Sequence, residues 1–125
     1  MAPAEAPSKP VRAQRGARAE ALAADFLIGR GLVLVARNFR TRQGEIDLIV
    51  RDRDTLVFVE VRLRTRAGYG GAAASITAAK QARLVAAAQA YLAQLGREPP
   101  CRFDAVLLDD LDPAGIEWER DILEA

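Results

Sequence analysis

The clearest pattern of apolar and polar positions in this chain lies in the stretch Gly44–Arg64. Two largely apolar, alternating runs flank a charged turn at residues 51–54, and no proline interrupts them. Such a pattern predicts two antiparallel strands joined by a tight turn. Acids break the apolar runs at Asp47 and Glu60, and Arg62 follows two positions after Glu60. The predicted hairpin is therefore also the first candidate for a functional site.

Strand periodicity places the two acids relative to each other. A hairpin that closes symmetrically about residues 52–53 pairs Asp47 with Phe58 and Glu45 with Glu60. Asp47 and Glu60 are then diagonal neighbours on one face, with backbones about 7–8 Å apart. Two carboxylates at that spacing can share a divalent cation, whose bonds to oxygen are about 2.1 Å long for magnesium. The alternative is a solvated acidic face, which the apolar Phe58 on the same face disfavours because buried acids need partners.

The remaining pattern predicts a single α/β domain over residues 16–125, in the order helix, three strands, helix, strand and a further edge strand. An aperiodic Pro- and Ala-rich segment precedes it and is predicted to be a disordered tail. Thr77 is a favourable N-cap for the second helix. Asp104 and Trp118 are interpreted as structural residues. The predicted ranges are tail 1–15, helix 16–30, strand 32–39, hairpin 44–64, helix 77–95, strand 102–108 and an edge strand from residue 116.

Two charged residues fall on the apolar faces of the predicted helices. At about 100° per residue, Glu20 lies among alanines and Leu27 on the first helix. An acid there needs a partner, so Glu20 is a candidate third carboxylate beside the hairpin. Lys80 lies one turn before Leu84 at a helix start, where its charge opposes the helix dipole and requires a nearby anion. The alternatives are long side chains that reach solvent and, for Glu20, a pair with an arginine.

Composition limits the chemistry that these residues can perform. The chain has no histidine, and its single cysteine, Cys101, has no internal disulfide partner and belongs to no zinc-binding cluster. Any metal site must therefore use oxygen ligands, which favours magnesium, manganese or calcium.

The charge distribution suggests an anionic partner. Residues 1–66 carry 13 Lys and Arg against 8 Asp and Glu, whereas residues 67–125 carry 5 against 9, so the halves differ as +5 and −4. A basic half with an acidic tail fits binding of an anion at one face, with random scatter of surface charge as the alternative. We expect no signal peptide, no membrane span and a cytoplasmic location.

Together these residues resemble the bacterial YraN-like family. The resemblance is carried by the segments Gly44–Ile49 and Phe58–Arg64, with Glu20, Lys80 and residues 102–104, and it extends over residues 16–108. It implies a restriction-endonuclease-like mixed sheet flanked by helices, similar to the Holliday junction resolvase-like branch of the PD-(D/E)XK nuclease superfamily. It also implies phosphodiester hydrolysis in branched or otherwise structured DNA, dependent on Mg²⁺ or Mn²⁺, and a homodimer that presents two sites.

The resemblance implies roles for individual residues. Asp47 and Glu60 are expected to bind the metal, and Glu20 to assist directly or through water. Arg62 stands where the superfamily has lysine; because arginine stays protonated, it is expected to steady transition-state charge rather than take up a proton. The expected nucleic-acid contacts, each with a merely solvated side chain as its alternative, are Arg64, Lys80, Arg40 and Arg42.

Two other functions stay open, and Arg62 is the residue that favours the first of them. One is a nucleic-acid-binding module that has the nuclease fold without catalysis. The other is a protein-interaction scaffold that uses the acidic C-terminal part and does not bind DNA in a salt-dependent way.

Overall fold

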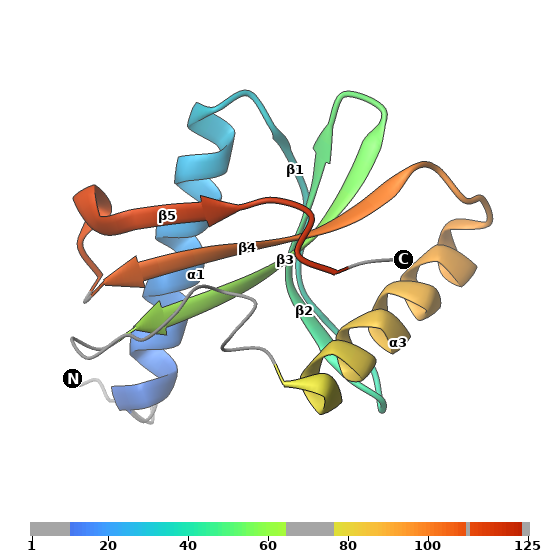
Figure 1. The fold of residues 1–125 in the computed structure, drawn as a ribbon, viewed down its shortest axis with the longest axis horizontal. Helices are drawn as coiled ribbons and strands as arrows, with labels where there is room; N and C mark the ends of the chain where they lie inside the picture. The colour runs from blue at the N-terminus through green and yellow to red at the C-terminus, as the bar shows by residue number, and fades with distance from the viewer. Residues whose placement is uncertain (1–10, 65–76, 110, 124–125) are drawn as a thin grey trace, which may run out of the picture.

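A five-stranded mixed sheet lies between two helices in the computed structural model, which describes residues 11–64, 77–109 and 111–123 (Figure 1). The strands lie in the order β1-β2-β3-β4-β5, and all neighbours are antiparallel except β3 and β4. This is the single α/β domain, with a mixed sheet flanked by helices, that the sequence predicts. The elements are α1 (Val11–Gly29), β1 (Val33–Arg40), β2 (Glu45–Asp52), β3 (Thr55–Arg64), α3 (Ala78–Leu95), β4 (Cys101–Asp109), the 3₁₀ turn η1 (Pro113–Gly115) and β5 (Ile116–Glu119).

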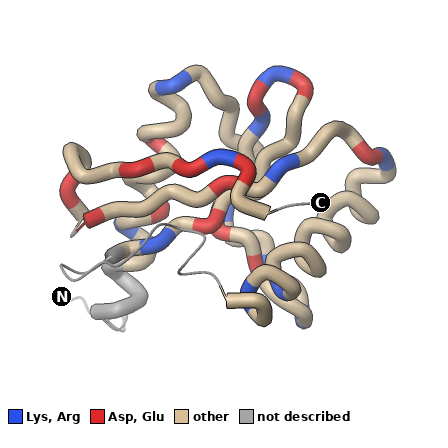
Figure 2. The backbone as a smooth tube through the Cα atoms, in the orientation of Figure 1, with Lys and Arg blue, Asp and Glu red and all other residues tan. Residues whose placement is uncertain are grey.

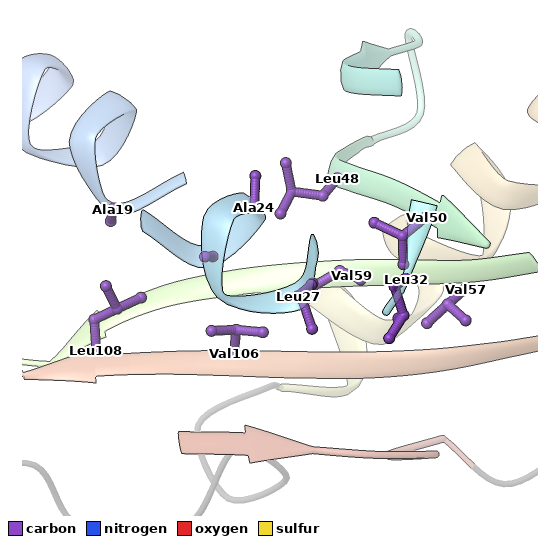
Figure 3. Packing of buried hydrophobic residues seen from close by; sticks show 11 residues of the cluster. Ala19, Ala24, Leu27, Leu32, Leu48, Val50, Val57, Val59, Val106 and Leu108 are labelled. Carbon is purple, nitrogen blue, oxygen red and sulfur yellow. The ribbon is translucent and has the colours of Figure 1, made fainter. Parts of the chain in front are cut away.

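The helix α1 covers one face of the sheet with small and branched side chains (Figure 3). Its alanines let the helix approach the strands closely, and Leu27 is fully buried. The strand residues in this core are Leu48, Val50, Val57, Val59, Val106 and Leu108. The helix begins at Val11, whereas the sequence predicts a tail up to residue 15. Because arginine, alanine and glutamine favour helix, Gly16 does not set the boundary; residues 1–10 lie outside the described part.

The helix α3 covers the opposite face, and both of its ends are capped. Thr77 accepts a hydrogen bond from the Lys80 amide at its N-terminus, as predicted. Gly96, with φ 79°, ends it and donates its amide proton to the Leu92 carbonyl. The core on this face contains Ile46, Ile49, Leu56, Phe58, Leu84, Ala87 and Ala88.

Gly44 brings the β1–β2 turn into direct contact with the backbone of α3. A Cβ atom at this position would lie 2.3 Å from the carbonyl oxygen of Arg83. Thr41 closes the turn, because its hydroxyl accepts hydrogen bonds from the amides of Gln43 and Gly44. The glycine therefore fixes the start of β2 against the first half of α3.

The register of the β2–β3 hairpin differs from the prediction by two residues. Ile49 lies opposite Phe58, and Asp52 opposite Thr55. The turn is formed by residues 53 and 54, and Arg53 adopts a positive φ of 58°. A two-residue hairpin turn requires this left-handed conformation, and its position was not evident from the sequence. The predicted pairs of Asp47 with Phe58 and of Glu45 with Glu60 are therefore wrong, but a shift by an even number of residues keeps Leu48 and Val50 on the predicted face. Ile46 is the exception, because it packs with Ile49 on the opposite face.

The last two strands surround a buried aspartate. Asp104 is 0% exposed and accepts hydrogen bonds from the Arg102 guanidinium, the Trp118 indole and the Asp121 amide. The predicted structural role of Asp104 is confirmed. Trp118 packs against Phe26 of α1, as expected for a structural residue, but its indole also donates to Asp104, which the sequence did not indicate. The predicted edge strand is β5.

Within the described ranges, neither helix has the length and hydropathy needed to cross a membrane.

Candidate active-site groove

Asp47 lies where the regular pairing of β2 with β3 ends. The last pair is Leu48 with Val59, and the next position along each strand brings Asp47 opposite Glu60. The Asp47 carboxylate turns toward β3 and accepts a hydrogen bond from the Val61 amide at 2.8 Å. Strand alternation also breaks here, because Ile46 and Ile49 pack in the same core although they are three residues apart.

A residue with left-handed backbone conformation in β1 accompanies this break. Arg37 lies opposite Leu48 and Phe39 opposite Ile46, so Asn38 faces Asp47 across the two strands. Asn38 has a positive φ of 52°, a conformation that asparagine tolerates better than most residues. The left-handed residue in β1 therefore lies opposite the position at which Asp47 turns toward β3.

The environment of Asp47 raises its pKa to about 8. Burial is the largest cause, because it penalises the charged form, and the negative charge of Glu60 is the next. The hydrogen bond from Val61 acts in the opposite direction, while Glu20 and Glu45 raise the pKa further. The fold therefore holds a carboxyl group in a place that disfavours its charge, and a cation bound beside it would relieve that effect.

Glu60 lies across from Asp47 and has two cationic neighbours. Its carboxylate oxygen Oε2 is 3.2 Å from Nζ of Lys80 and 3.7 Å from a guanidinium nitrogen of Arg62. The Glu60 side chain is 14% exposed, so little solvent screens these contacts. The sequence prediction that Lys80 requires an anion is confirmed, and Glu60 is that anion.

Asp47 and Glu60 open into one groove of about 760 Å³. The wall of the groove comes from the β1–β2 turn with the adjoining strand ends, the C-terminal half of β3, the first turns of α3 and Gly16 of α1. Five cationic and three acidic residues line it, which gives a net positive wall. They are Arg40, Arg42, Arg62, Lys80 and Arg83 against Glu45, Asp47 and Glu60. Figure 2 shows acidic residues along β5 and the end of β4, and basic residues at the start of α3.

The other predicted residues are placed as follows. Arg40 and Arg42 line the groove, and Arg40 forms an exposed ion pair with Glu45 at 3.1 Å. Glu20 is half-buried on α1 and is close enough for its charge to act on Asp47, but it is not part of the groove wall. Arg64 ends β3, and its side chain lies outside the described part. The predicted roles of these residues in catalysis and binding stay predictions.

Arg83 and Gly44 are contributions to the groove that the sequence reasoning did not assign. Arg83 comes three residues after Lys80, so both lie on the same side of α3. That spacing was a usable signal in the sequence. The contact of Gly44 with the Arg83 backbone was not, because it depends on how α3 packs on the sheet.

The donor atoms of the groove suit a hard divalent cation. Asp47 and Glu60 offer carboxylate oxygens, the ligands that Mg²⁺ and Mn²⁺ prefer. Among the described residues, no group of three or more acidic or cysteine side chains is gathered closely enough to hold a metal. Magnesium commonly binds through one or two carboxylates with water as its other ligands, so the pair fits such an ion.

Comparison with known sequences finds a matching family model and similar proteins from several organisms. The sequence model of a family described as "Uncharacterised protein family UPF0102" matches residues 19–108, from α1 to β4. A UPF0102 protein of Methylobacillus flagellatus is 54% identical over 112 residues, which cover 90% of this chain and 98% of that protein. One from Nitrosospira multiformis is 54% identical over 110 residues, 88% of this chain and 92% of the relative. One from Ralstonia nicotianae is 51% identical over 125 residues, 96% and 94% of the two chains.

Proposed function

The chain belongs to UPF0102, the YraN family, and we propose its function from the groove. The protein is a divalent-metal-dependent nuclease that hydrolyses phosphodiester bonds in branched or otherwise structured DNA. We also propose a homodimer, because a resolvase-like reaction on a junction requires two sites. The proposed location is the cytoplasm.

One observation carries this proposal. Two largely buried carboxylates, Asp47 and Glu60, face each other across neighbouring strands inside a groove with a net positive wall. A protein that only needed a stable sheet would gain more from apolar residues at these positions. Paired acids beside cations suit a metal ion and a phosphate, which carry opposite charges and bind side by side.

Each residue has a distinct role in the proposed reaction. Asp47 and Glu60 hold Mg²⁺ or Mn²⁺, and Glu20 assists from α1 through water. The bound cation supplies Lewis-acid activation of water and of the phosphate. Arg62 stabilises the charge that develops on the phosphate. The phosphate contacts come from Lys80, Arg64, Arg40, Arg42 and Arg83.

Arg62 and Lys80 also support a second candidate, a nucleic-acid-binding module without catalysis. Both already neutralise Glu60 from one side. Arginine cannot accept a proton from water in practice, so a reaction that relies on a basic lysine at position 62 is closed to this chain. The same groove would then bind phosphate without cleaving it.

A cleavage time course on a labelled four-way junction separates the two candidates. We expect cutting in Mg²⁺ and Mn²⁺ by the wild type, a collapse of cutting with Asp47→Asn, and no change with Asp25→Asn, an exposed acid on α1. DNA binding by Asp47→Asn, measured by gel shift in Ca²⁺, should persist or tighten because a repulsive carboxylate is gone. Binding without cutting of any branched, flapped or single-stranded DNA by the wild type would establish the binding module instead.

A further inference from the structure

The contact between Lys80 and Glu60 joins the start of α3 to the carboxylate pair. Lys80 is the third residue after the cap Thr77, and its ammonium group lies 3.2 Å from Oε2 of Glu60. The side chain of Lys80 is 35% exposed and that of Glu60 is 14% exposed, so the lysine reaches from the groove surface down to a buried acid. Arg62 approaches the same oxygen at 3.7 Å.

We propose that Lys80 occupies the place on Glu60 that a divalent cation requires, and that a nucleic-acid phosphate draws Lys80 away, so that DNA and metal each strengthen the binding of the other. This inference rests on the proposed function, because it takes Asp47 and Glu60 to be the metal ligands. It adds to that function a competition between one side chain and the metal.

The surroundings of Lys80 allow its side chain to move while its backbone stays fixed. Gly44 packs against the Arg83 carbonyl, which holds the first half of α3 on the sheet, and Thr77 caps the first turn of the helix. The lysine side chain, in contrast, is a flexible four-carbon stem with a compact charge. A cation at the start of a helix is disfavoured by the dipole, so Glu60 is the main attraction that holds Lys80 in place.

The electrostatic consequence follows from the pairing. With Lys80 on Glu60, part of the negative charge available to a metal is already neutralised. When the lysine moves to a phosphate, Glu60 faces Asp47 with less compensation, and the pair attracts a divalent cation more strongly. Because coupling between two binding events is reciprocal, the metal must in turn strengthen phosphate binding by the same factor.

Calorimetric titration with MnCl₂ alone tests the competition. We expect Lys80→Met to bind Mn²⁺ about tenfold more tightly than the wild type, a factor within the usual range of coupling between sites. Arg97→Met is the matched control: it removes an exposed cation that does not line the groove, so it should change the affinity by about twofold or less. Equal affinity of Lys80→Met and Arg97→Met for Mn²⁺ would overturn the inference.

The first arm of a second measurement uses only the wild type, and its second arm uses Lys80→Met. Fluorescence anisotropy of a labelled phosphorothioate junction should show tighter binding in Mn²⁺ than in NaCl of equal ionic strength, and the gain should shrink about threefold or more in Lys80→Met. Wild-type affinity for the junction that does not depend on Mn²⁺ contradicts the coupling. If the wild type and Lys80→Met both fail to bind Mn²⁺, the metal-dependent function itself falls; if both bind it equally, only the role of Lys80 falls.

Discussion

Two aspartates on strands of the same sheet, the fully buried Asp104 and the partly buried Asp47, have opposite surroundings. Asp104 on β4 collects hydrogen bonds from a guanidinium, an indole and a backbone amide, and its neighbour Arg102 also binds Asp52 at 3.1 Å. Asp47 on β2 accepts one hydrogen bond within the described part of the chain, from Val61, and faces another carboxylate. The first acid is fully compensated by the fold, whereas the second is compensated only in part. The difference separates an acid that stabilises the protein from one that is available to a ligand.

The largest effect is expected at the compensated acid. Asp104→Ala removes the shared acceptor of Arg102, Trp118 and the Asp121 amide and leaves their polar groups buried without it. We expect a loss of about 3–5 kcal/mol in the free energy of unfolding. Urea denaturation measures it, with Asp25→Ala on the exposed face of α1 as the control. A loss below about 1 kcal/mol, the ordinary effect of a surface substitution, would show that the network is not structural.

Asp47 should behave in the opposite way, and its effect should depend on pH. The folded protein keeps Asp47 protonated up to a pKa of about 8, whereas the unfolded chain releases the proton near the ordinary value of 3.8. Between those values the unfolded state binds fewer protons than the folded state. The contribution of Asp47 to the free energy of unfolding is therefore complete below about pH 4, falls as the pH rises, and is lost above about pH 8.

Asp47→Asn removes that dependence, because the amide does not titrate and its oxygen can still accept the hydrogen bond from Val61. We expect the variant to be more stable than the wild type at pH 8 by about 2–3 kcal/mol and equal to it near pH 4. Urea denaturation at several pH values measures the difference, with Asp25→Asn as the matched control. A difference in the free energy of unfolding between Asp47→Asn and the wild type that stays constant from pH 4 to pH 8 would show that the fold does not disfavour the charge of Asp47.

A substitution at Gly44 tests whether the packing of α3 on the sheet positions Asp47 and Glu60. Gly44→Ala places a methyl group on the Arg83 carbonyl, which belongs to rigid backbone, and should destabilise the protein by about 1–3 kcal/mol. It should also weaken Mn²⁺ binding, since the start of β2 must shift away from α3. Gly29→Ala is the control, because a Cβ atom there meets nothing within 4 Å. Unchanged stability and Mn²⁺ affinity in Gly44→Ala would show that the turn does not position the site.

The smallest effect on stability is expected at Arg62. Arg62→Lys exchanges one cation for another on a partly exposed side chain, so the free energy of unfolding should change by no more than about 0.5 kcal/mol. DNA affinity should be retained, and cutting should equal or exceed that of the wild type, because lysine can also orient the attacking water. The junction-cleavage assay measures the change. A large loss of cutting by Arg62→Lys would mean that the planar guanidinium, with its several donors, is itself required.

Much of the fold follows from local patterns in the sequence. Period-2 alternation gave the strands and the opposite faces of Val57 and Phe58, and Thr77 gave the start of α3. The hairpin register did not follow, because the choice between two adjacent turn positions depends on which residue adopts a positive φ, and Arg53 has no preference for it. The helix start at Val11 was missed because no strong cap signal marks it in the sequence.

The residues of the candidate site could be named from the sequence. How far hydrogen bonds and cations compensate the charge of each acid could not. Apolar neighbours such as Phe58 indicated that the acids are buried, and the position of Lys80 indicated a nearby anion. The hydrogen bond from Val61 to Asp47 and the close approach of Gly44 to α3 depend on how strands and helix pack together, which is a tertiary feature. Sequence alone therefore cannot distinguish the surroundings of Asp47 from those of Asp104.

A crystal of the wild-type protein soaked in MnCl₂ at about pH 8 tests most directly whether the uncompensated acid is a ligand site. Anomalous scattering identifies manganese whatever the substrate is. We predict one anomalous peak in the groove, bonded at about 2.1–2.2 Å to a carboxylate oxygen of Asp47 and one of Glu60, and no peak in a crystal of Asp47→Asn treated in the same way. A wild-type crystal with Lys80 still on Glu60 and no manganese between the two acids would contradict the assignment of this groove as a metal site.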